Sequence, residues 1–193
     1  MSICVDYSDV NAQTVKDSFI LPRIDQVWPS FFRARFFASL DLLMGFKQVE
    51  VDPRDRATTA FLTHRGIYVY NVMPFKLCNA SATIQRHMEK VLGPLIGLGV
   101  LVYNDDVLIY AKTPEQLVDI LSGGLILLLK EGLKCKASKC SVLTQIINFL
   151  GRVVSKYCIN SDPAKLDKIR QWPKPKKAQD SHPSMASANT TKI

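Results

Sequence analysis

The sequence lacks a hydrophobic run long enough to cross a membrane, and its start lacks the apolar core of a secretory signal. The longest apolar stretches, residues 91–103 and 125–129, are interrupted by Gly and Pro or fall far short of the about 20 residues that a membrane helix needs. The N-terminus reads MSICVDYSDVN, without an apolar segment. We therefore expect a soluble, intracellular chain with no membrane partner.

Histidine is scarce and the number of cysteines is odd, which argues against both a zinc site and a disulfide framework. A structural zinc site needs about four ligands, usually in two close pairs, and the three histidines are scattered. Only Cys135 and Cys140 lie close together in the sequence. Since five cysteines cannot all pair with one another, a reducing compartment is the simpler interpretation.

The composition is that of a globular chain with an excess of basic residues. The 193 residues suit one domain, or one domain plus a fragment. The hydrophobic fraction of 47% and the charged fraction of 22% are usual for globular proteins. The 25 Lys and Arg residues exceed the 17 Asp and Glu residues, so the formal net charge is +8. This charge fits either a protein that binds a polyanion or a protein with an ordinary basic surface.

Short apolar runs between turn residues predict strands in both halves of the chain. Residues 58–62 and 67–72 are expected to form a hairpin, and residues 146–154 a strand pair that bends at a glycine. Strands are also expected at 36–42, 100–103 and 107–110, and the last two are separated only by Asn104, Asp105 and Asp106.

Helical spacing of apolar residues predicts two helices in the second half of the chain. One begins after the cap-like residues 79–83 and ends near Gly93. The other begins at Thr113, a candidate cap that is followed by Pro114, and runs to about Leu129. Its long apolar run is expected to leave hydrophobic surface exposed.

Two adjacent carboxylates, Asp105 and Asp106, stand between two very apolar strands. Adjacent acids repel each other unless solvent or a cation relieves them. One interpretation is a solvated turn, because Asn and Asp are common turn residues. The other is a site for a divalent metal such as Mg²⁺, which prefers hard oxygen ligands. A third acid in a similar apolar setting, Asp41, favours the second interpretation.

The tetrapeptide YNDD at residues 103–106 resembles the Y-x-D-D signature of reverse transcriptases, in particular those of long-terminal-repeat retrotransposons of the Ty3/gypsy type. Further blocks appear in the order of that family over nearly nine-tenths of the chain. They are CVDY at 4–7, LPRID at 21–25, SLDL at 39–42, TAF at 59–61, VMPF at 72–75, SKC at 138–140, FLG at 149–151 and DPAK at 162–165.

The resemblance implies an α+β fold, namely the palm and part of the fingers of a right-hand polymerase, with an antiparallel sheet and helices packed on one face. Residues 1–177 would form this domain, with partial fingers and the start of a thumb. Residues 178–193 would form a disordered tail without counterpart in the family. Apart from the resemblance, that tail has no periodicity and is rich in Ser, Ala, Asn and Thr.

The resemblance also implies a catalytic centre made of Asp41, Asp105 and Asp106. These acids, with the backbone carbonyl of Leu42, would hold two Mg²⁺ ions, or Mn²⁺. Two such ions stabilise the attacking and leaving oxygens of an in-line displacement. The reaction would be RNA-directed DNA synthesis, in which deoxynucleoside triphosphates extend a primer paired with an RNA or DNA template.

Further roles follow from the family positions that this sequence matches. Phe46 would lie beneath the sugar of the nucleotide, and Phe75 would line the nucleotide pocket, although packing alone could explain Phe46. The residues expected to contact nucleic acid are Gln85, Arg86, Phe149, Leu150 and Gly151. For Gln85 and Arg86, a solvated helix face is an equal alternative.

Several positions depart from the family pattern and leave an alternative open. Lys76 replaces a usual glycine, which would crowd a turn, and Asn104 is polar where an apolar residue is common. By the same resemblance, the upstream fingers residues that grip the triphosphate would be missing from this sequence. The alternative is therefore an inactive retroelement remnant that retains at most nucleic-acid binding. Either protein would be part of a longer polyprotein, in a cytoplasmic particle or the nucleus.

Overall fold

The computed structural model describes residues 5–19, 22, 28–31, 34–157 and 159–161. Its centre is a four-stranded antiparallel sheet with the strand order β4-β5-β1-β6. The strands are β1 (Phe36–Asp41), β4 (Val100–Tyr103), β5 (Asp106–Ala111) and β6 (Ser141–Thr144). The expected α+β class and antiparallel sheet are confirmed.

The central strands are buried on both faces, which explains why β5 is apolar without interruption. Val107 and Ile109 of β5 belong to the larger hydrophobic core, whereas Leu108, between them, belongs to a second core on the opposite face. Since successive side chains of a strand point to opposite faces, a strand covered on both sides needs no polar alternation.

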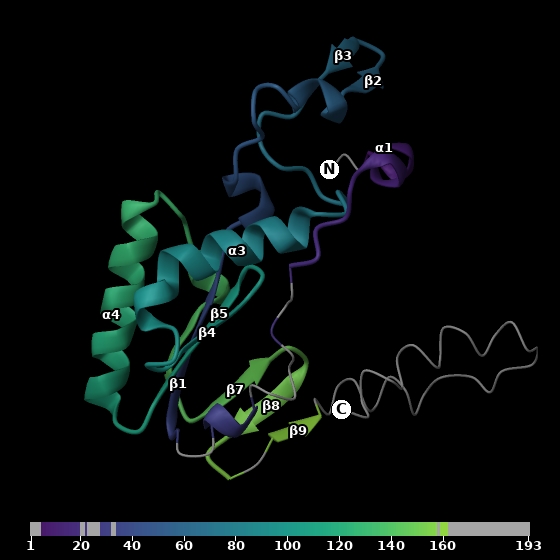
Figure 1. The fold of residues 1–193 in the computed structure, drawn as a ribbon. Helices are drawn as coiled ribbons and strands as arrows, with labels where there is room; N and C mark the ends of the chain where they lie inside the picture. The colour runs from purple at the N-terminus through teal and green to yellow at the C-terminus, as the bar shows by residue number, and fades with distance from the viewer. Residues whose placement is uncertain (1–4, 20–21, 23–27, 32–33, 158, 162–193) are drawn as a thin grey trace, which may run out of the picture.

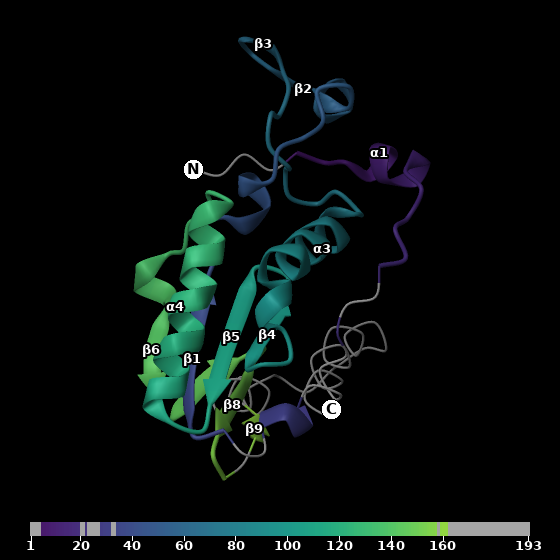
Figure 2. The ribbon, with the colours of Figure 1, turned by 60° about the vertical axis from the view of Figure 1, so that its left-hand side comes forward.

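Two helices cover one face of this sheet, as Figures 1 and 2 show. They are α3 (Ala80–Leu92) and α4 (Pro114–Lys130). The helix α4 starts within a residue of the expected position, whereas α3 starts inside the segment expected to cap it. The Thr113 hydroxyl accepts a hydrogen bond from the Gln116 N–H (3.3 Å), which caps α4. Two short turns, η4 (Gly93–Leu95) and η5 (Ala137–Lys139), follow these helices.

A small three-stranded sheet lies against the other face. It consists of β7 (Ile146–Phe149), β8 (Arg152–Ser155) and β9 (Ile159–Ser161). Phe149 and Val154 pack with Phe37 of β1 in the second core, together with Phe31 of η1 (Trp28–Phe31). The β7–β8 turn has positive φ at Leu150 (49°) and Gly151 (74°), as the twist of a two-residue hairpin requires.

The fingers-like part lies beyond one end of the central sheet (Figure 1). It contains α1 (Ser8–Gln13), η2 (Gly45–Gln48), η3 (Arg56–Thr59), β2 (Phe61–Thr63) and β3 (Gly66–Tyr68). The strands β2 and β3 form the expected hairpin, although both are shorter than expected. The block at 162–165 and the tail at 178–193 lie outside the described residues.

The helix α4 carries exposed apolar side chains, as its sequence predicted. Leu129 is 76% exposed and Ile126 is 53% exposed, and Val118 and Leu125 are also exposed. The buried side of the same helix carries Leu117, Leu121 and Leu128. In the part of the chain that the structure describes, no helix is both long enough and apolar enough to span a membrane.

Lys76 adopts a left-handed backbone conformation (φ 73°), and replacing it with glycine should stabilise the fold. This conformation destabilises the folded state by about 1–2 kcal/mol for a residue with a Cβ. Glycine avoids that strain, but it loses more conformational entropy on folding, which costs about 0.5–1 kcal/mol. We therefore expect Lys76→Gly to raise the free energy of unfolding by about 0.5–1 kcal/mol, measured by urea denaturation.

Lys76→Ala is the control for this prediction, because alanine removes the charge and the long side chain but keeps the Cβ. It should leave the free energy of unfolding near that of the wild type. A Lys76→Gly protein that unfolds at the same or a lower urea concentration than Lys76→Ala would contradict the strain at this turn.

Candidate functional site

The register of the central sheet brings together two acids that are 65 residues apart in the sequence. β1 and β5 pair so that Asp41 lies directly opposite Asp106. Cross-strand partners point to the same face, and this face also carries Phe37 and Leu108. The two carboxylates therefore project from the face opposite α3 and α4, at the end of the sheet.

Asp105 is held next to this pair by the tight turn between β4 and β5. Tyr103 and Asp106 are the last paired residues, and Asn104 takes a left-handed conformation (φ 55°), which Asn tolerates well. The Leu42 N–H donates to the Asp105 carbonyl oxygen (3.2 Å). The Leu42 backbone, expected to supply a metal ligand, is thus beside the turn that carries the acids.

Gly45 allows the close approach of η2 to this turn. A Cβ added at Gly45 would lie 2.7 Å from the Asp105 Cβ, closer than real Cβ contacts allow. Any side chain at this position would displace Asp105 or the loop. The requirement for glycine here comes from the packing of two distant segments, not from an unusual φ.

Gln85 fixes the same turn from inside the protein. Its side chain is fully buried, and its Oε1 accepts a hydrogen bond from the Asn104 N–H (2.6 Å). Its Nε2 donates to the Val102 carbonyl oxygen (3.1 Å) and to Glu89 Oε1 (2.8 Å). The expected contact of Gln85 with nucleic acid does not fit a side chain without exposed surface; Gln85 positions the acidic turn instead.

Arg86 is exposed but already has partners on the N-terminal segment. Its guanidinium forms an ion pair with Asp17 (2.6 Å) and lies over the ring of Phe19, 4.8 Å from the ring centre. Asn79 bonds the same segment through the Val15 carbonyl and the Asp17 N–H. Arg86 thus helps to hold residues 15–19 against α3, and a template contact would compete with this ion pair.

The carboxylates form a strongly negative cluster. Burial raises the pKa of Asp106 above its usual range, and the negative charges of Asp105 and Asp41 raise it further. The Lys139 ammonium acts in the opposite direction on the Asp106 pKa. The raised pKa of Asp106 therefore reflects its burial first and the partly compensated negative charge of its neighbours second.

Lys139 supplies that partial compensation. Its Nζ lies 2.8 Å from Asp41 Oδ2, and this hydrogen bond and the charge of Asp41 raise the pKa of Lys139. Asp106 and Asp105 raise it by smaller amounts. The Lys139 ammonium thus lies in the negative field of three carboxylates, which favours a cation at this position.

The donor set suits a hard divalent cation, although the described side chains are not already arranged around one. Carboxylate oxygens are the ligands that Mg²⁺ prefers. Among the residues that the structure describes, no three His, Cys, Asp or Glu side chains converge on one metal position. Asp41 is instead paired with the Lys139 ammonium, 2.8 Å away.

Phe46 and Phe75, expected in the nucleotide pocket, lie together near the acids. Their ring centres are 5.5 Å apart in an edge-to-face arrangement, and Phe46 also packs against the main core. Phe75 is 46% exposed, and the Lys47 ammonium lies 5.9 Å from its ring centre. The structure thus brings this pair of rings together.

The β7–β8 hairpin faces the acids across a cavity of about 270 Å³. Asp41, Asp106 and Lys139 line one side, and Phe149 and Leu150 line the other. Phe149 is buried (4% exposed), so its ring supports the hairpin and leaves the turn to face the cavity. Gly151 completes that turn. The expected nucleic-acid residues of this hairpin thus stand opposite the catalytic candidates.

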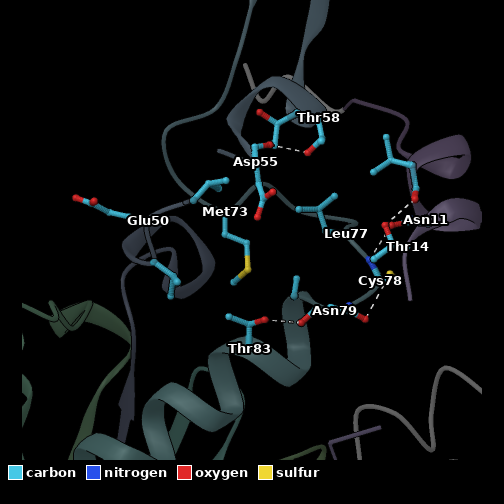
Figure 3. Close-up of a pocket in the computed structure, with 15 residues that line it drawn as sticks. Asn11, Thr14, Glu50, Asp55, Thr58, Met73, Leu77, Cys78, Asn79 and Thr83 are labelled. Atoms are coloured by element: carbon cyan, nitrogen blue, oxygen red, sulfur yellow. Dashed lines mark hydrogen bonds between the residues drawn. The ribbon is translucent and has the colours of Figure 1, made fainter. Parts of the chain in front are cut away.

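A larger cavity of about 440 Å³ lies at the junction of α1, the start of α3 and residues 49–59 (Figure 3). None of the three candidate catalytic acids lines it. Figure 3 shows Asp55 pointing into this space, with Met73 below it and Leu77 beside it. The Asn11 side chain fixes the turn at its edge by bonding the Lys76 carbonyl and the Cys78 N–H (both 2.8 Å).

Sequence reasoning assigned no site role to Gly45 or Lys139, and it placed Gln85 on the surface. Lys139 occurs inside a block that resembles the family and Gly45 follows one, yet nothing local distinguishes these two residues. The Lys139–Asp41 contact spans 98 residues. For Gln85 a signal existed, because it precedes the apolar Met88 by three residues and Leu92 by seven, which puts it on the buried helix face.

Comparison with known protein families identifies the chain. Residues 1–154 match the family model described as "Reverse transcriptase (RNA-dependent DNA polymerase)". The chain is 34% identical over 178 residues to the retrovirus-related Pol polyprotein from transposon 297 and 31% identical over 173 residues to that from transposon gypsy, both of Drosophila melanogaster. The two alignments cover 92% and 90% of this chain but only 17% of each relative.

Solved structures share the fold at lower identity. A foamy viral protease-reverse transcriptase in complex with double-stranded DNA matches with a TM-score of 0.87 and 21% identity, over 95% of this chain and 32% of that chain. A foamy viral protease-reverse transcriptase in complex with RNA/DNA hybrid matches with a TM-score of 0.85, over 25% of that chain. The fold class expected from the sequence is therefore confirmed.

Neutralising Asp106 should stabilise the protein at neutral pH in the absence of divalent ions. Because the folded state raises the pKa of Asp106, ionisation of this group lowers stability as the pH rises from the unfolded-state value, about 3.9, through the folded-state value. We expect Asp106→Asn to melt at a higher temperature than the wild type at pH 7 in EDTA. The gain should shrink towards pH 3.

Asp119→Asn, which alters an exposed acid on α4, is the control and should show no such pH-dependent gain. A melting temperature of Asp106→Asn below that of the wild type at pH 7, or an equal gain at pH 3 and pH 7, would contradict the electrostatic account of the cluster.

Proposed function

The chain belongs to the reverse transcriptase family, and on that premise we propose that it transfers nucleotides from deoxynucleoside triphosphates to the 3′-hydroxyl of a primer on an RNA or DNA template. The observation that carries the proposal is the pairing of Asp41 with Asp106 beside the Asp105 turn. The chain spans about one-sixth of its curated relatives, so the proposal concerns this domain alone.

Two Mg²⁺ ions, or Mn²⁺, would be held by Asp41, Asp105, Asp106 and the Leu42 carbonyl. Divalent ions in such a site activate the attacking hydroxyl and neutralise the charge of the triphosphate and its leaving group. The raised pKa of Asp106 supports this assignment, because a cation would favour the ionised carboxylate. The Lys139 ion pair supports it too, since it shows that Asp41 accepts a cationic partner.

Lys139 would exchange partners when substrate binds. Its ammonium is exposed to solvent on a short turn and is bound to Asp41 by a single contact. Once Asp41 holds another cation, the ammonium is free to bond a phosphate oxygen of the substrate. Positioning and charge neutralisation provide most of the catalysis in phosphoryl transfer, so this movement would place a positive charge where negative charge develops.

The two sides of the site would hold the two substrates. Phe46 and Phe75 would contact the sugar and base of the incoming nucleotide, and the turn at Phe149, Leu150 and Gly151 would contact the primer. The cavity between Asp41 and Leu150 supports the second role. The foamy viral neighbours bound to double-stranded DNA and to RNA/DNA hybrid support a template–primer duplex as the partner.

Asp105→Asn should reduce Mg²⁺-dependent primer extension by more than about 100-fold, because it removes charge that holds the ions and stabilises the transition state. Extension of a labelled primer on RNA and DNA templates, with and without EDTA, measures this. Asp119→Asn on the surface of α4 should extend at the rate of the wild type.

Two results would contradict the proposal in different ways. Wild-type rates for Asp105→Asn would assign the activity to another site or to a contaminant. Salt-dependent duplex binding by a wild-type chain that never extends the primer would instead support the binding-only alternative that the net charge of +8 allows.

Phe46→Ala should increase ribonucleotide use relative to deoxynucleotide use by roughly 10- to 100-fold, because removing the ring opens space beside the sugar 2′ position. Phe46→Tyr keeps the ring and should keep the discrimination. The ratio of kcat/KM for the two nucleotide types measures this effect. Equal losses for both types would support packing against Phe75 and the core as the role of Phe46.

A further inference from the structure

Two chain segments that carry site residues meet just beyond the end of β1. The Leu43 N–H donates to the Lys134 carbonyl oxygen, and the Lys136 N–H donates to the Asp41 carbonyl oxygen (both 2.8 Å). Leu42 and Cys135 form an antiparallel bridge between these bonds. This short ladder aligns the residues before η5 with the loop that leads into η2.

The Gln48 side chain adds three further hydrogen bonds to this junction. Its Nε2 donates to the Leu43 carbonyl oxygen (2.8 Å) and to the Lys134 carbonyl oxygen (2.9 Å). Its Oε1 accepts from the Lys134 N–H (2.7 Å). Both amide hydrogens are therefore used, and the paired donor and acceptor on Lys134 imitate one more rung of a β-ladder.

We propose that Gln48 is a positioning residue that fixes the loop carrying Phe46 relative to the segment carrying Lys139. Phe46 lies two residues before Gln48 in η2, and Lys139 lies five residues after Lys134 at the end of η5. One side chain thus joins the expected sugar side of the nucleotide site to the cation that contacts Asp41. The part of this inference that concerns nucleotide use rests on the proposed function.

The chemistry of the amide explains why this position needs glutamine. Alanine removes all three bonds. Glutamate has the same length, and one oxygen can still accept from the Lys134 N–H, but the other would face two carbonyl oxygens that now lie 2.8 and 2.9 Å from Nε2. A carboxylate there is repelled, whereas a protonated carboxyl group can donate one of the two lost bonds.

Amide hydrogen exchange tests this link without any need for activity. In Gln48→Ala, the protection factor of the Lys134 amide should fall at least about fivefold, as expected for one lost hydrogen bond. The amides of Lys47 in η2 and Lys139 in η5 should lose protection as well if Gln48 couples the two segments. Gln48→Glu keeps the acceptor for the Lys134 N–H but loses both donated bonds. At pH 8 it should therefore retain more protection at Lys134 than Gln48→Ala while Lys47 and Lys139 lose protection, and their protection should return as the carboxyl group is protonated at low pH.

Gln116→Ala is the matched control, because Gln116 Oε1 also accepts a backbone N–H, that of Lys112 (3.3 Å), at the start of α4. It should leave Lys47, Lys134 and Lys139 unchanged. Wild-type protection of Lys134 in Gln48→Ala would overturn the inference. Loss of protection at Lys134 alone, with Lys47 and Lys139 unchanged, would overturn the coupling.

Nucleotide kinetics separate positioning from a merely structural role. With the active fraction determined by titration, Gln48→Ala should raise KM for deoxynucleotides about tenfold and lower the discrimination against ribonucleotides. A lower kcat with unchanged KM and unchanged discrimination would mean that Gln48 only stabilises the fold, and would overturn the inference. If the wild type extends no primer, the proposed function fails, and the exchange experiment alone decides whether Gln48 couples the segments.

Discussion

The pairing of β1 with β5 is the constraint on which the site depends. It places Asp41 opposite Asp106 and leaves Asp105 in the adjoining turn. The apolar residues of these strands fix this register, because a shift by one residue would move Leu108 and Val107 to the wrong cores. Burial of the sheet on both faces therefore stabilises an arrangement of like charges that would separate if the carboxylates were free to move.

The surrounding structure compensates for this repulsion in two ways. Gln85 holds the backbone of the acidic turn from the buried side, and Gly45 leaves the space in which Asp105 fits. Lys139 supplies one positive charge at Asp41. The protein thus combines rigid backbone support with a cation on a short exposed turn. The support keeps the acids in place, while the cation is held at Asp41 by one ion pair and remains exposed to solvent.

Most of the central fold could be predicted from local sequence patterns, and most of the contacts around the acids could not. The strand runs at 100–103 and 107–110 and the Thr113 cap each carry their signal within a few residues, and the structure has these elements as expected. The Lys139–Asp41 contact instead joins residues 98 apart, and the Gln48–Lys134 contact joins residues 86 apart. Such contacts depend on how the segments pack, which no local pattern contains.

Gln85 shows how a pattern and a resemblance can point in different directions. Helical spacing with Met88 and Leu92 favours the buried face, whereas the family resemblance favoured a contact with nucleic acid. Burial of an amide is costly unless its donors and acceptor are bonded, and here Asn104, Val102 and Glu89 bond them. A buried polar residue among apolar neighbours is thus best explained by the backbone it supports, and the backbone here is the one that carries the acids.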